Sequence, residues 1–450
     1  MLTIILLVSA YLITTVVKDG HNMWAGDFAL YVNQAKHLSD GNLQEAYEIN
    51  KYSMENSIKE IGPYLYPNGF PILLAPIYQL FGLDFLKMKY LCAFFFLLSI
   101  PVLYKVFKSN FNSIIYAFII IILIAFNPHF IIFCDMILSD LPFFFLVILS
   151  FYLMTLKNSV INQVFLASSI FYAYFTRDIG IVLLPTLLAY QIMNKEKYTS
   201  RKWIKYIPYA LFVSAYAIIK LIFPSGGANH LEMFFSGITI DRIFGNFEYY
   251  MLLLSDVFFF GSLDFVLGLA LMLFTIFGAV ISFKQYAYFI VFIVLYFAVL
   301  LVWPSVQGVR FLFPLLPLFV FFGLKGIQFL IEKIKVKPII AYGFMCIYLL
   351  VFSVNSFGQI NEYAKLNTNE VDIPETREVY EYLSSEIPSD ATIGFIKPRV
   401  LWLFTDVKCI DTDLDHFDNS VADFLLLHNG SDTGNYQIEK QFKHFVLLKK

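Results

Sequence analysis

Long apolar runs recur along the first 355 residues of the chain. A helix needs roughly 17 to 25 mostly apolar residues to cross the hydrocarbon core of a membrane, and about eleven windows come close to that length. They lie near residues 2–17, 88–107, 112–127, 139–156, 160–176, 178–193, 204–223, 256–283, 285–303, 310–331 and 338–354. The pattern predicts a polytopic α-helical membrane protein, with a pair of short or re-entrant spans around Arg177.

Basic residues are distributed unevenly over the loops between these windows. If the first window runs outward from the cytoplasm, nearly every loop on the inside carries Lys or Arg, as the positive-inside rule requires. The inside residues are Lys105, Lys108, Lys157, Lys195, Lys197, Arg201, Lys202, Lys284, Lys333, Lys335 and Lys337. Three segments then lie outside the membrane: a loop at 18–87, a loop at 224–255 and the tail after Asn355.

The segment 356–450 has a different character from the rest of the chain. Prolines punctuate a helical stretch at 375–386 and apolar, strand-like runs at 391–396 and 421–427. This alternation predicts a small α/β domain, and fewer than about 100 residues give such a domain only a limited core. We therefore expect a membrane domain at 1–355 and an extracytoplasmic domain that packs on it.

The composition agrees with a lipid environment and narrows the classes of function. Of the 450 residues, 59% are hydrophobic and 15% are charged, whereas about a quarter are charged in an ordinary soluble chain. The formal net charge is −2 and no basic stripe occurs outside short loops, which speaks against nucleic-acid binding. The four cysteines show neither CxxC nor Cys/His spacing, so neither a disulfide framework nor a zinc site is expected.

A carboxylate directly after the first apolar window is the first candidate for chemistry. The apolar residues that follow Asp27 on one helical face are Phe28, Tyr31, Val32, Ala35 and Leu38. They predict an amphipathic helix on the outer membrane surface, with Asp27 in its first turn. Asp27 suits such a helix start for structural reasons alone. Its carboxylate can also act as a general base on an acceptor hydroxyl or bind a divalent cation.

The end of the same outer loop predicts a rigid turn. Its sequence is Tyr64-Leu65-Tyr66-Pro67-Asn68-Gly69-Phe70-Pro71, and an apolar run at 72–81 follows. The prolines and the glycine favour a turn into a buried or interfacial helix that is too short to span with ease. Taken alone, the motif is typical of a structural elbow.

Charged residues also occur at three places where a membrane tolerates them poorly. Asp140 opens the fourth window in the sequence Ser-Asp-Leu-Pro, which is equally a good helix start. Arg177 and Asp178 interrupt an otherwise apolar stretch, and a mutual ion pair or snorkelling would also account for them. Arg310 enters the span that follows the last short outer turn.

The predicted topology brings Asp27, Asp140, Arg177 and Arg310 to one face of the membrane. Arginine is well suited to anchoring phosphate, because its planar fork offers paired donors and keeps its charge. Acidic and cationic groups together at a membrane surface suit a phosphorylated lipid substrate.

Six short motifs, taken in order, resemble the GT-C class of membrane glycosyltransferases. The resemblance is to the branch that includes protein mannosyltransferases, aminoarabinose lipid A transferases and RgtA/B/C/D-like proteins, and it covers about residues 1–330. The motifs are Gly26-Asp27-Phe28-Ala29-Leu30-Tyr31, Tyr66-Pro67-Asn68-Gly69-Phe70-Pro71-Ile72-Leu73-Leu74, Asn127-Pro128-His129-Phe130, Ser139-Asp140-Leu141-Pro142, Arg177-Asp178-Ile179-Gly180 and Arg310-Phe311-Leu312-Phe313-Pro314-Leu315-Leu316-Pro317. No Trp-Trp-Asp motif occurs, so a resemblance to oligosaccharyltransferases is not supported.

The resemblance implies transfer of a single sugar from a polyprenyl phosphate on the outer side of the membrane, without a nucleotide-sugar donor. Asp27 matches the position that the family uses as catalytic base or metal-proximal residue. Many relatives have a second acid next to it, where this chain has Phe28. Asp140 can supply that acid, as a matching aspartate does in the aminoarabinose branch. A divalent cation held by Asp27 and Asp140 is the one cofactor that this arrangement suggests.

The expected site therefore has a catalytic base and a set of substrate-binding residues. Asp27 would take the proton of an acceptor hydroxyl on a lipid, glycan or protein, and a single displacement would invert the anomeric configuration. The substrate-binding candidates are Arg177, Arg310, Asp140, Tyr66 and Asn68. We expect the protein in the cell membrane, with this site and the C-terminal domain extracytoplasmic and with that domain capping the cavity or helping to choose the acceptor.

Two other functions fit a polytopic protein with charges in its spans. A flippase for a polyprenyl-linked lipid or sugar predicts broken helices or an internal repeat, and the sequence shows no convincing repeat. A non-catalytic scaffold of a surface-polysaccharide pathway is the other alternative, because only one acid follows the first window. The long outer loop and the outer domain favour a one-sided enzyme.

Overall fold

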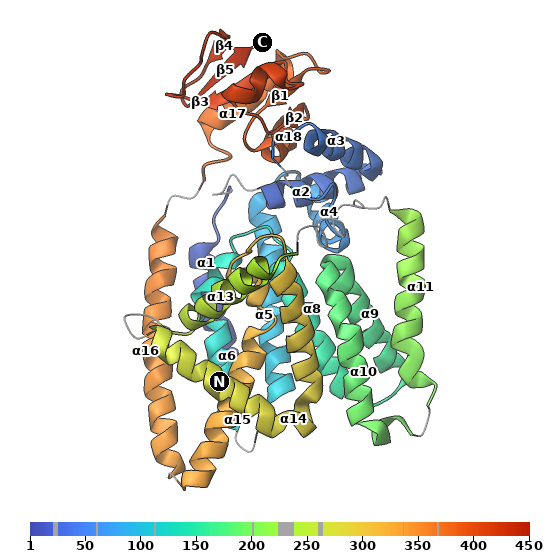
Figure 1. The fold of residues 1–450 in the computed structure, drawn as a ribbon, viewed down its shortest axis with the longest axis vertical. Coiled ribbons are helices and arrows are strands. Elements are labelled where there is room, and N and C mark those ends of the chain that lie inside the picture. Colours follow the sequence, from blue (N-terminus) through green and yellow to red (C-terminus); the bar gives the residue numbers. More distant parts are fainter. Residues whose placement is uncertain are drawn as a thin grey trace.

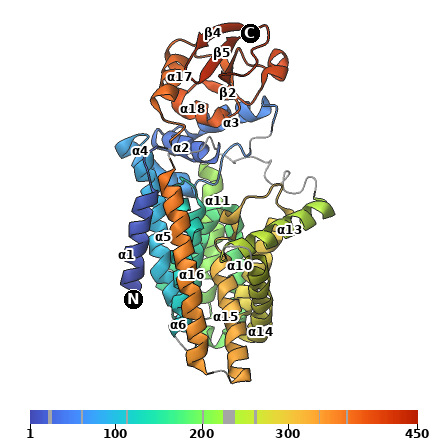
Figure 2. The ribbon, with the colours of Figure 1, turned by 90° about the vertical axis from the view of Figure 1, so that its left-hand side faces the viewer.

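The computed structural model shows a bundle of long helices that carries a small sheet domain at one end (Figure 1). Two short helices, α2 (Gly26–Ser39) and α3 (Leu43–Glu55), lie between the two parts, and the perpendicular view shows the same order of layers (Figure 2). This architecture confirms the predicted helical membrane protein with a small C-terminal α/β domain. The structure describes residues 1–20, 26–59, 62–111, 114–199, 202–223, 238–259, 264–335, 337–366 and 369–450.

Most helices of the bundle begin and end within a few residues of the predicted apolar windows. Their bounds are α1 (Leu2–Val16), α5 (Phe85–Phe107), α6 (Ile114–Ala125), α7 (Pro128–Phe133), α8 (Asp140–Thr155), α9 (Val160–Thr176), α10 (Leu183–Met193), α11 (Ile207–Ile222), α14 (Asp264–Val302), α15 (Leu316–Ile334) and α16 (Pro338–Lys365). Among the described residues, four helical segments are long and apolar enough to cross a membrane, and six shorter apolar helices accompany them. The figure of about eleven spans stays a prediction.

The predicted span at 256–283 begins later than expected. The residues before it form a separate helix, α13 (Ile240–Asp256), whose buried face repeats every fourth residue at Asn246, Tyr250 and Leu254. The exposed Glu248 and Asp256 lie on other faces of α13, so the helix is amphipathic and not uniformly apolar. Helix α14 then runs from Asp264 to Val302, with a non-helical break at Tyr286 that lies close to the predicted boundary.

One expected boundary differs from the structure, and parts of two expected loops fall outside the described residues. Helix α16 continues to Lys365, so the expected domain boundary at 355 falls inside a helix. The polar residues after Asn355 continue the same helix. Arg201 of the expected inside loop and residues 224–237 of the expected outer loop lie outside the described residues.

Helix α2 forms where the amphipathic pattern predicts it, but it is buried on more than one face. Phe28, Val32 and Ala35 belong to the core of the membrane domain. Leu30 belongs to a second core that contains residues of the C-terminal domain. The helix is therefore packed between two bodies and does not lie with a free polar face on the membrane surface.

The C-terminal domain is a five-stranded sheet with two helices. Its strands are in the order β2-β1-β3-β5-β4, with β1 parallel to β2 and β3 and with β5 antiparallel to β3 and β4. The elements are α17 (Pro374–Ser385), β1 (Thr392–Gly394), α18 (Pro398–Thr405), β2 (Lys408–Ile410), β3 (Phe424–His428), β4 (Gln437–Gln441) and β5 (Phe445–Lys449). Its core continues into the first loop through Leu43, Ala46 and Leu65, so the domain packs on α2 and α3.

Candidate active site

Helix α2 presents Asp27 from its first turn, and the chain at 66–68 is fixed beside it. The amide of Gln34 pairs with the backbone of Tyr66 on both sides: Nε2 donates to the carbonyl oxygen at 2.9 Å, and Oε1 accepts from the backbone N–H at 2.9 Å. Gln34 Nε2 also donates to Asn68 Oδ1 at 3.0 Å. The predicted elbow is therefore docked onto α2, and the helix α4 (Gly69–Phe81) begins directly after it.

Tyr66 holds the Asp27 carboxylate from one side. The Tyr66 hydroxyl donates to Asp27 Oδ1 at 2.7 Å. The Tyr66 ring stacks on Tyr31, with ring centroids 4.6 Å apart, and the Tyr31 hydroxyl lies 2.9 Å from Ser139 Oγ. A chain of side chains thus connects Asp27 to the start of α8.

Arg310 holds the same carboxylate from the other side. Its Nη2 donates to Asp27 Oδ2 at 3.0 Å and to Gln307 Oε1 at 2.6 Å. The turn that presents it contains Gly308 with φ of 70°, a conformation that favours glycine. Asn246 of α13 caps the preceding helix end, where its amide donates to the Trp303 carbonyl at 2.9 Å. The turn at Gly308 and the hydrogen bond from α13 to the residue after α14 therefore fix the position of Arg310.

Asp140 and Arg177 form a second ion pair. Arg177 Nη1 lies 2.5 Å from Asp140 Oδ1, and the two side chains are 15% and 3% exposed. Asp140 is the first residue of α8, and Arg177 caps the C-terminal end of α9. The Arg177 guanidinium also lies 4.4 Å from the centroid of the Phe311 ring. The structural explanations by a helix start and by an ion pair therefore both apply here. The expected ion pair joined Arg177 to Asp178, whereas the ion pair in the structure joins Arg177 to Asp140.

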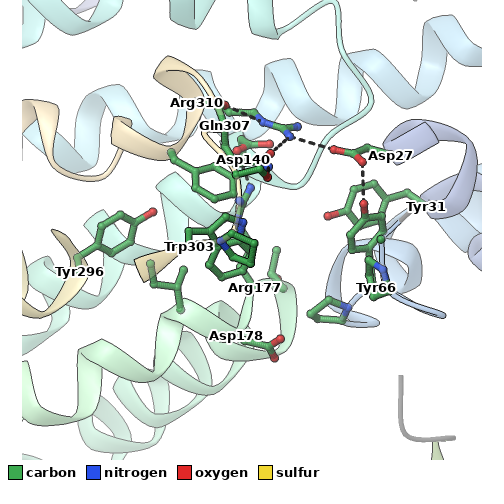
Figure 3. Close-up of a pocket in the computed structure, with 18 residues that line it drawn as sticks. Asp27, Tyr31, Tyr66, Asp140, Arg177, Asp178, Tyr296, Trp303, Gln307 and Arg310 are labelled. Atoms are coloured by element: carbon green, nitrogen blue, oxygen red, sulfur yellow. Dashed lines mark hydrogen bonds and ion pairs between the residues drawn. The ribbon is translucent and has the colours of Figure 1, made fainter. Parts of the chain in front are cut away.

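These groups line one cavity of about 300 Å³ at the end of the bundle nearest α2 (Figure 3). Of the candidate residues, Asp27, Tyr66, Asp140, Arg177 and Arg310 belong to its lining. The remaining lining residues are Tyr31, Gly62, Pro63, Pro67, Thr176, Asp178, Ile179, Tyr296, Trp303, Pro304, Ser305, Gln307 and Phe311. Charged groups thus meet aromatic and apolar walls, a combination that suits an amphiphilic ligand.

Asn68 is the one substrate-binding candidate outside this lining. It is buried, and its side chain accepts from Gln34 within the docked turn. Its position fits support of the turn that carries Tyr66. Its expected role in substrate binding stays a prediction.

The electrostatics of the site keep Asp27 ionised. Burial alone raises the pKa of this carboxyl group, but the Arg310 charge, the Tyr66 hydrogen bond and the nearby Arg399 charge outweigh it, so the pKa lies below its usual value. Burial and the neighbouring Asp27 charge raise the pKa of Tyr66, which keeps its phenol protonated as a donor. At neutral pH the site therefore contains a carboxylate held by a neutral donor and a cation.

A cation at Asp27 and Asp140 fits this arrangement poorly. Both oxygens of Asp27 are engaged by Tyr66 and Arg310, and Asp140 faces Arg177. No group of three His, Cys, Asp or Glu side chains with metal-binding proximity occurs in the part of the chain that the structure describes. Hard cations bind through several oxygen ligands, whereas both carboxylates here already pair with arginines. The metal site stays a prediction.

Several residues of the site were not predicted from the sequence. Tyr31 and Gln34 sit on α2 within two turns of Asp27, and their partners lie in other elements. Tyr296 lines the cavity from within α14, where it is one aromatic residue among many. Only the spacing of Tyr31 from Asp27, four positions along a helix, could have suggested that they share a face.

Solved structures that are similar to this chain identify the class of its fold. ArnT from Cupriavidus metallidurans in the apo state matches 99% of this chain and 97% of its own, with a TM-score of 0.57 and 10% identity. The structure of ArnT from Cupriavidus metallidurans bound to undecaprenyl phosphate matches the same shares, with a TM-score of 0.59 and 11% identity. An oligosaccharyltransferase from Archaeoglobus fulgidus, tethered to an acceptor peptide with an NVT sequon, matches 95% of this chain and 69% of its own, with a TM-score of 0.55 and 10% identity.

These proteins are GT-C membrane glycosyltransferases, so the predicted GT-C fold is confirmed. The match covers nearly the whole chain and extends past the 330 residues that carry the sequence motifs. It also includes an oligosaccharyltransferase, although the chain lacks the Trp-Trp-Asp motif. No protein-family model and no curated protein matches the chain by sequence.

Proposed function

We propose that the protein is a glycosyltransferase that moves a single sugar from a polyprenyl-phosphate donor to a lipid, glycan or protein acceptor at the outer face of a cell membrane. One observation carries the proposal: a single cavity is lined by the Asp27 carboxylate, by Arg310, which pairs with Asp27, and by Arg177, which pairs with Asp140. A base next to two anchors for an anion is what displacement of a lipid phosphate by a hydroxyl requires.

The arginines are the expected binding site of the donor phosphate. Arginine keeps its charge and binds phosphate oxygens with paired donors. The aromatic walls formed by Trp303, Tyr296 and Phe311 suit the adjoining sugar and the first isoprene units. The shared fold of ArnT, which has been solved with undecaprenyl phosphate bound, supports this class of donor.

Asp27 is the expected general base. The acceptor hydroxyl gives its proton to the Asp27 carboxylate, and its oxygen forms the new bond to the anomeric carbon. The bond from that carbon to the phosphate oxygen breaks, and the phosphate leaves with the electron pair. Arg310 and Arg177 stabilise the growing negative charge. One displacement inverts the anomeric configuration.

The ion pair between Asp27 and Arg310 gives the donor a second effect. In this structure Arg310 is shared between Asp27 and Gln307. A donor phosphate that binds Arg310 competes with Asp27 for the same donors. Asp27 then loses part of the interaction that lowers its pKa and becomes a stronger base only when the donor is bound.

The test is transfer from a panel of radiolabelled polyprenyl-phosphate sugars by the purified full-length protein, with cell-envelope extract as acceptor. The variant Asp27→Asn is the inactive control, and Glu48→Gln is the matched control, because Glu48 is an exposed carboxylate of the same loop. Label that reaches a product with wild type and Glu48→Gln but not with Asp27→Asn supports the proposal and names the donor. No transfer from any donor by folded protein would favour a flippase or a scaffold.

A further inference from the structure

The helix α18 of the C-terminal domain directs one arginine toward the cavity. Arg399 is the second residue of α18, and only 3% of its surface is exposed. Its backbone carbonyl accepts from Asn33 Nδ2 of α2 at 3.4 Å. The side chain contacts Asn50 and Pro63, which lie outside the C-terminal domain.

The guanidinium of Arg399 clamps the chain that forms one wall of the cavity. Its Nη2 donates to the Pro63 carbonyl at 2.6 Å, and its Nε donates to Asn50 Oδ1 at 3.1 Å. Asn50 Nδ2 in turn donates to the carbonyls of Pro63 at 3.0 Å and Tyr64 at 2.7 Å. Pro63 and the preceding Gly62 line the cavity. Two long-range side chains therefore fix the backbone that leads into Tyr66.

Arg399 also lies against Tyr66 and against Gly26, the residue before Asp27. Its guanidinium carbon is 5.8 Å from the centroid of the Tyr66 ring. A Cβ atom added to Gly26, the residue before Asp27, would lie 3.5 Å from Arg399 Cδ. The arginine thus packs between the start of α2 and the turn that carries the hydrogen-bond donor of Asp27.

We propose that Arg399 is a positioning residue of the active site, so that the C-terminal domain completes the site by fixing Tyr66 and Asp27. The inference rests on the proposed function for the role of Asp27. Burying a guanidinium is costly, and packing alone could be met by an apolar side chain. The charge has a further effect at the site, because Arg399 contributes to the lowered pKa of Asp27.

The test uses a readout that does not depend on transfer. A hydrophobic carbodiimide modifies protonated carboxyl groups, so the pH dependence of Asp27 labelling, followed by mass spectrometry, reports the protonation of Asp27 in the full-length protein. Arg399→Met is expected to move the labelling midpoint to higher pH. Arg310→Met is the positive control, and Arg377→Met is the matched control, because Arg377 is an exposed arginine of the same domain that pairs with Asp372. An unchanged midpoint in folded Arg399→Met would overturn the inference.

The conservative variant separates positioning from stability. Arg399→Lys keeps a charge near Tyr66 but cannot donate to both Pro63 and Asn50 in the same geometry. We expect a melting temperature and a labelling midpoint near those of wild type, with a lowered kcat for transfer. Wild-type kcat in Arg399→Lys would overturn the inference, and this variant decides if Arg399→Met does not fold. Absence of transfer in wild type would instead refute the proposed function, while the labelling result would still decide the role of Arg399.

Discussion

Arg310 Nη2 and Asp27 Oδ2 are 3.0 Å apart, although the two residues are separated by 283 positions in the chain. The contact joins α2 of the outer loop to the turn before α15, and both residues line the cavity. Because the Asp27 side chain is one third exposed and Arg310 is 18% exposed, the pair is open to an incoming anion. Under the proposed function, a donor phosphate that binds Arg310 at this pair also changes the basicity of Asp27.

Removal of the Arg310 charge should affect both binding and chemistry. In Arg310→Met, loss of one preorganised donor to the leaving phosphate should lower kcat by about 10²-fold to 10³-fold. Binding of polyprenyl phosphate, measured by isothermal titration calorimetry in detergent, should weaken. Arg377→Met serves as the control for loss of an arginine outside the cavity. Wild-type affinity and rate in Arg310→Met would show that Arg310 does not bind the donor.

Asp140 and Arg177 should contribute to stability as well as to binding. Breaking a buried ion pair from one side typically destabilises a protein by about 3–5 kcal/mol, so Asp140→Asn should lower the melting temperature measured by differential scanning fluorimetry. Asp406→Asn is the matched control, since its partner Lys36 forms an ion pair in which Asp406 is exposed. Equal melting temperatures for the two variants would contradict a supporting role of the buried pair.

The hydrogen bond from Tyr66 should set the acid limb of the transfer reaction. The bond lowers the pKa of Asp27, so Tyr66→Phe should raise that pKa, and activity should be lost at a higher pH as the solution is acidified. The sign follows from the base form: transfer needs the carboxylate and declines as pH falls through its pKa. Tyr47→Phe is the control. An acid limb that stays in place in Tyr66→Phe would show that the bond does not tune Asp27.

Local features of the site were predictable because they depend on residues that are close together in the sequence. The helix that begins beside Asp27, the start of α8 at Asp140 and the break at Arg177 all follow from polar residues next to apolar runs. The motif resemblance also predicted the GT-C fold. The prediction that Asp27, Asp140 and Arg177 lie at one face of the membrane needed only the alternation of spans across it.

Long-range pairings were not predictable from one sequence. The side chains of Lys89 and Asp135 are at most 1% exposed and pair at 2.9 Å inside the bundle. Neither residue indicates its partner in the sequence. The position of Arg399 depends on how the C-terminal sheet domain docks on α2, which no local pattern encodes. The helix α13 was missed as a separate element because its apolar face merges with the window that follows it.

The most direct test of the account is single-turnover transfer by Asp27→Asn, with polyprenyl-phosphate binding measured on the same preparation. The account predicts donor binding at least as tight as in wild type, because Arg310 loses a competing carboxylate. It also predicts a transfer rate lower by about 10²-fold to 10⁴-fold, the usual contribution of a general base. A folded Asp27→Asn protein that transfers sugar at the wild-type rate would contradict the assignment of Asp27 as the base.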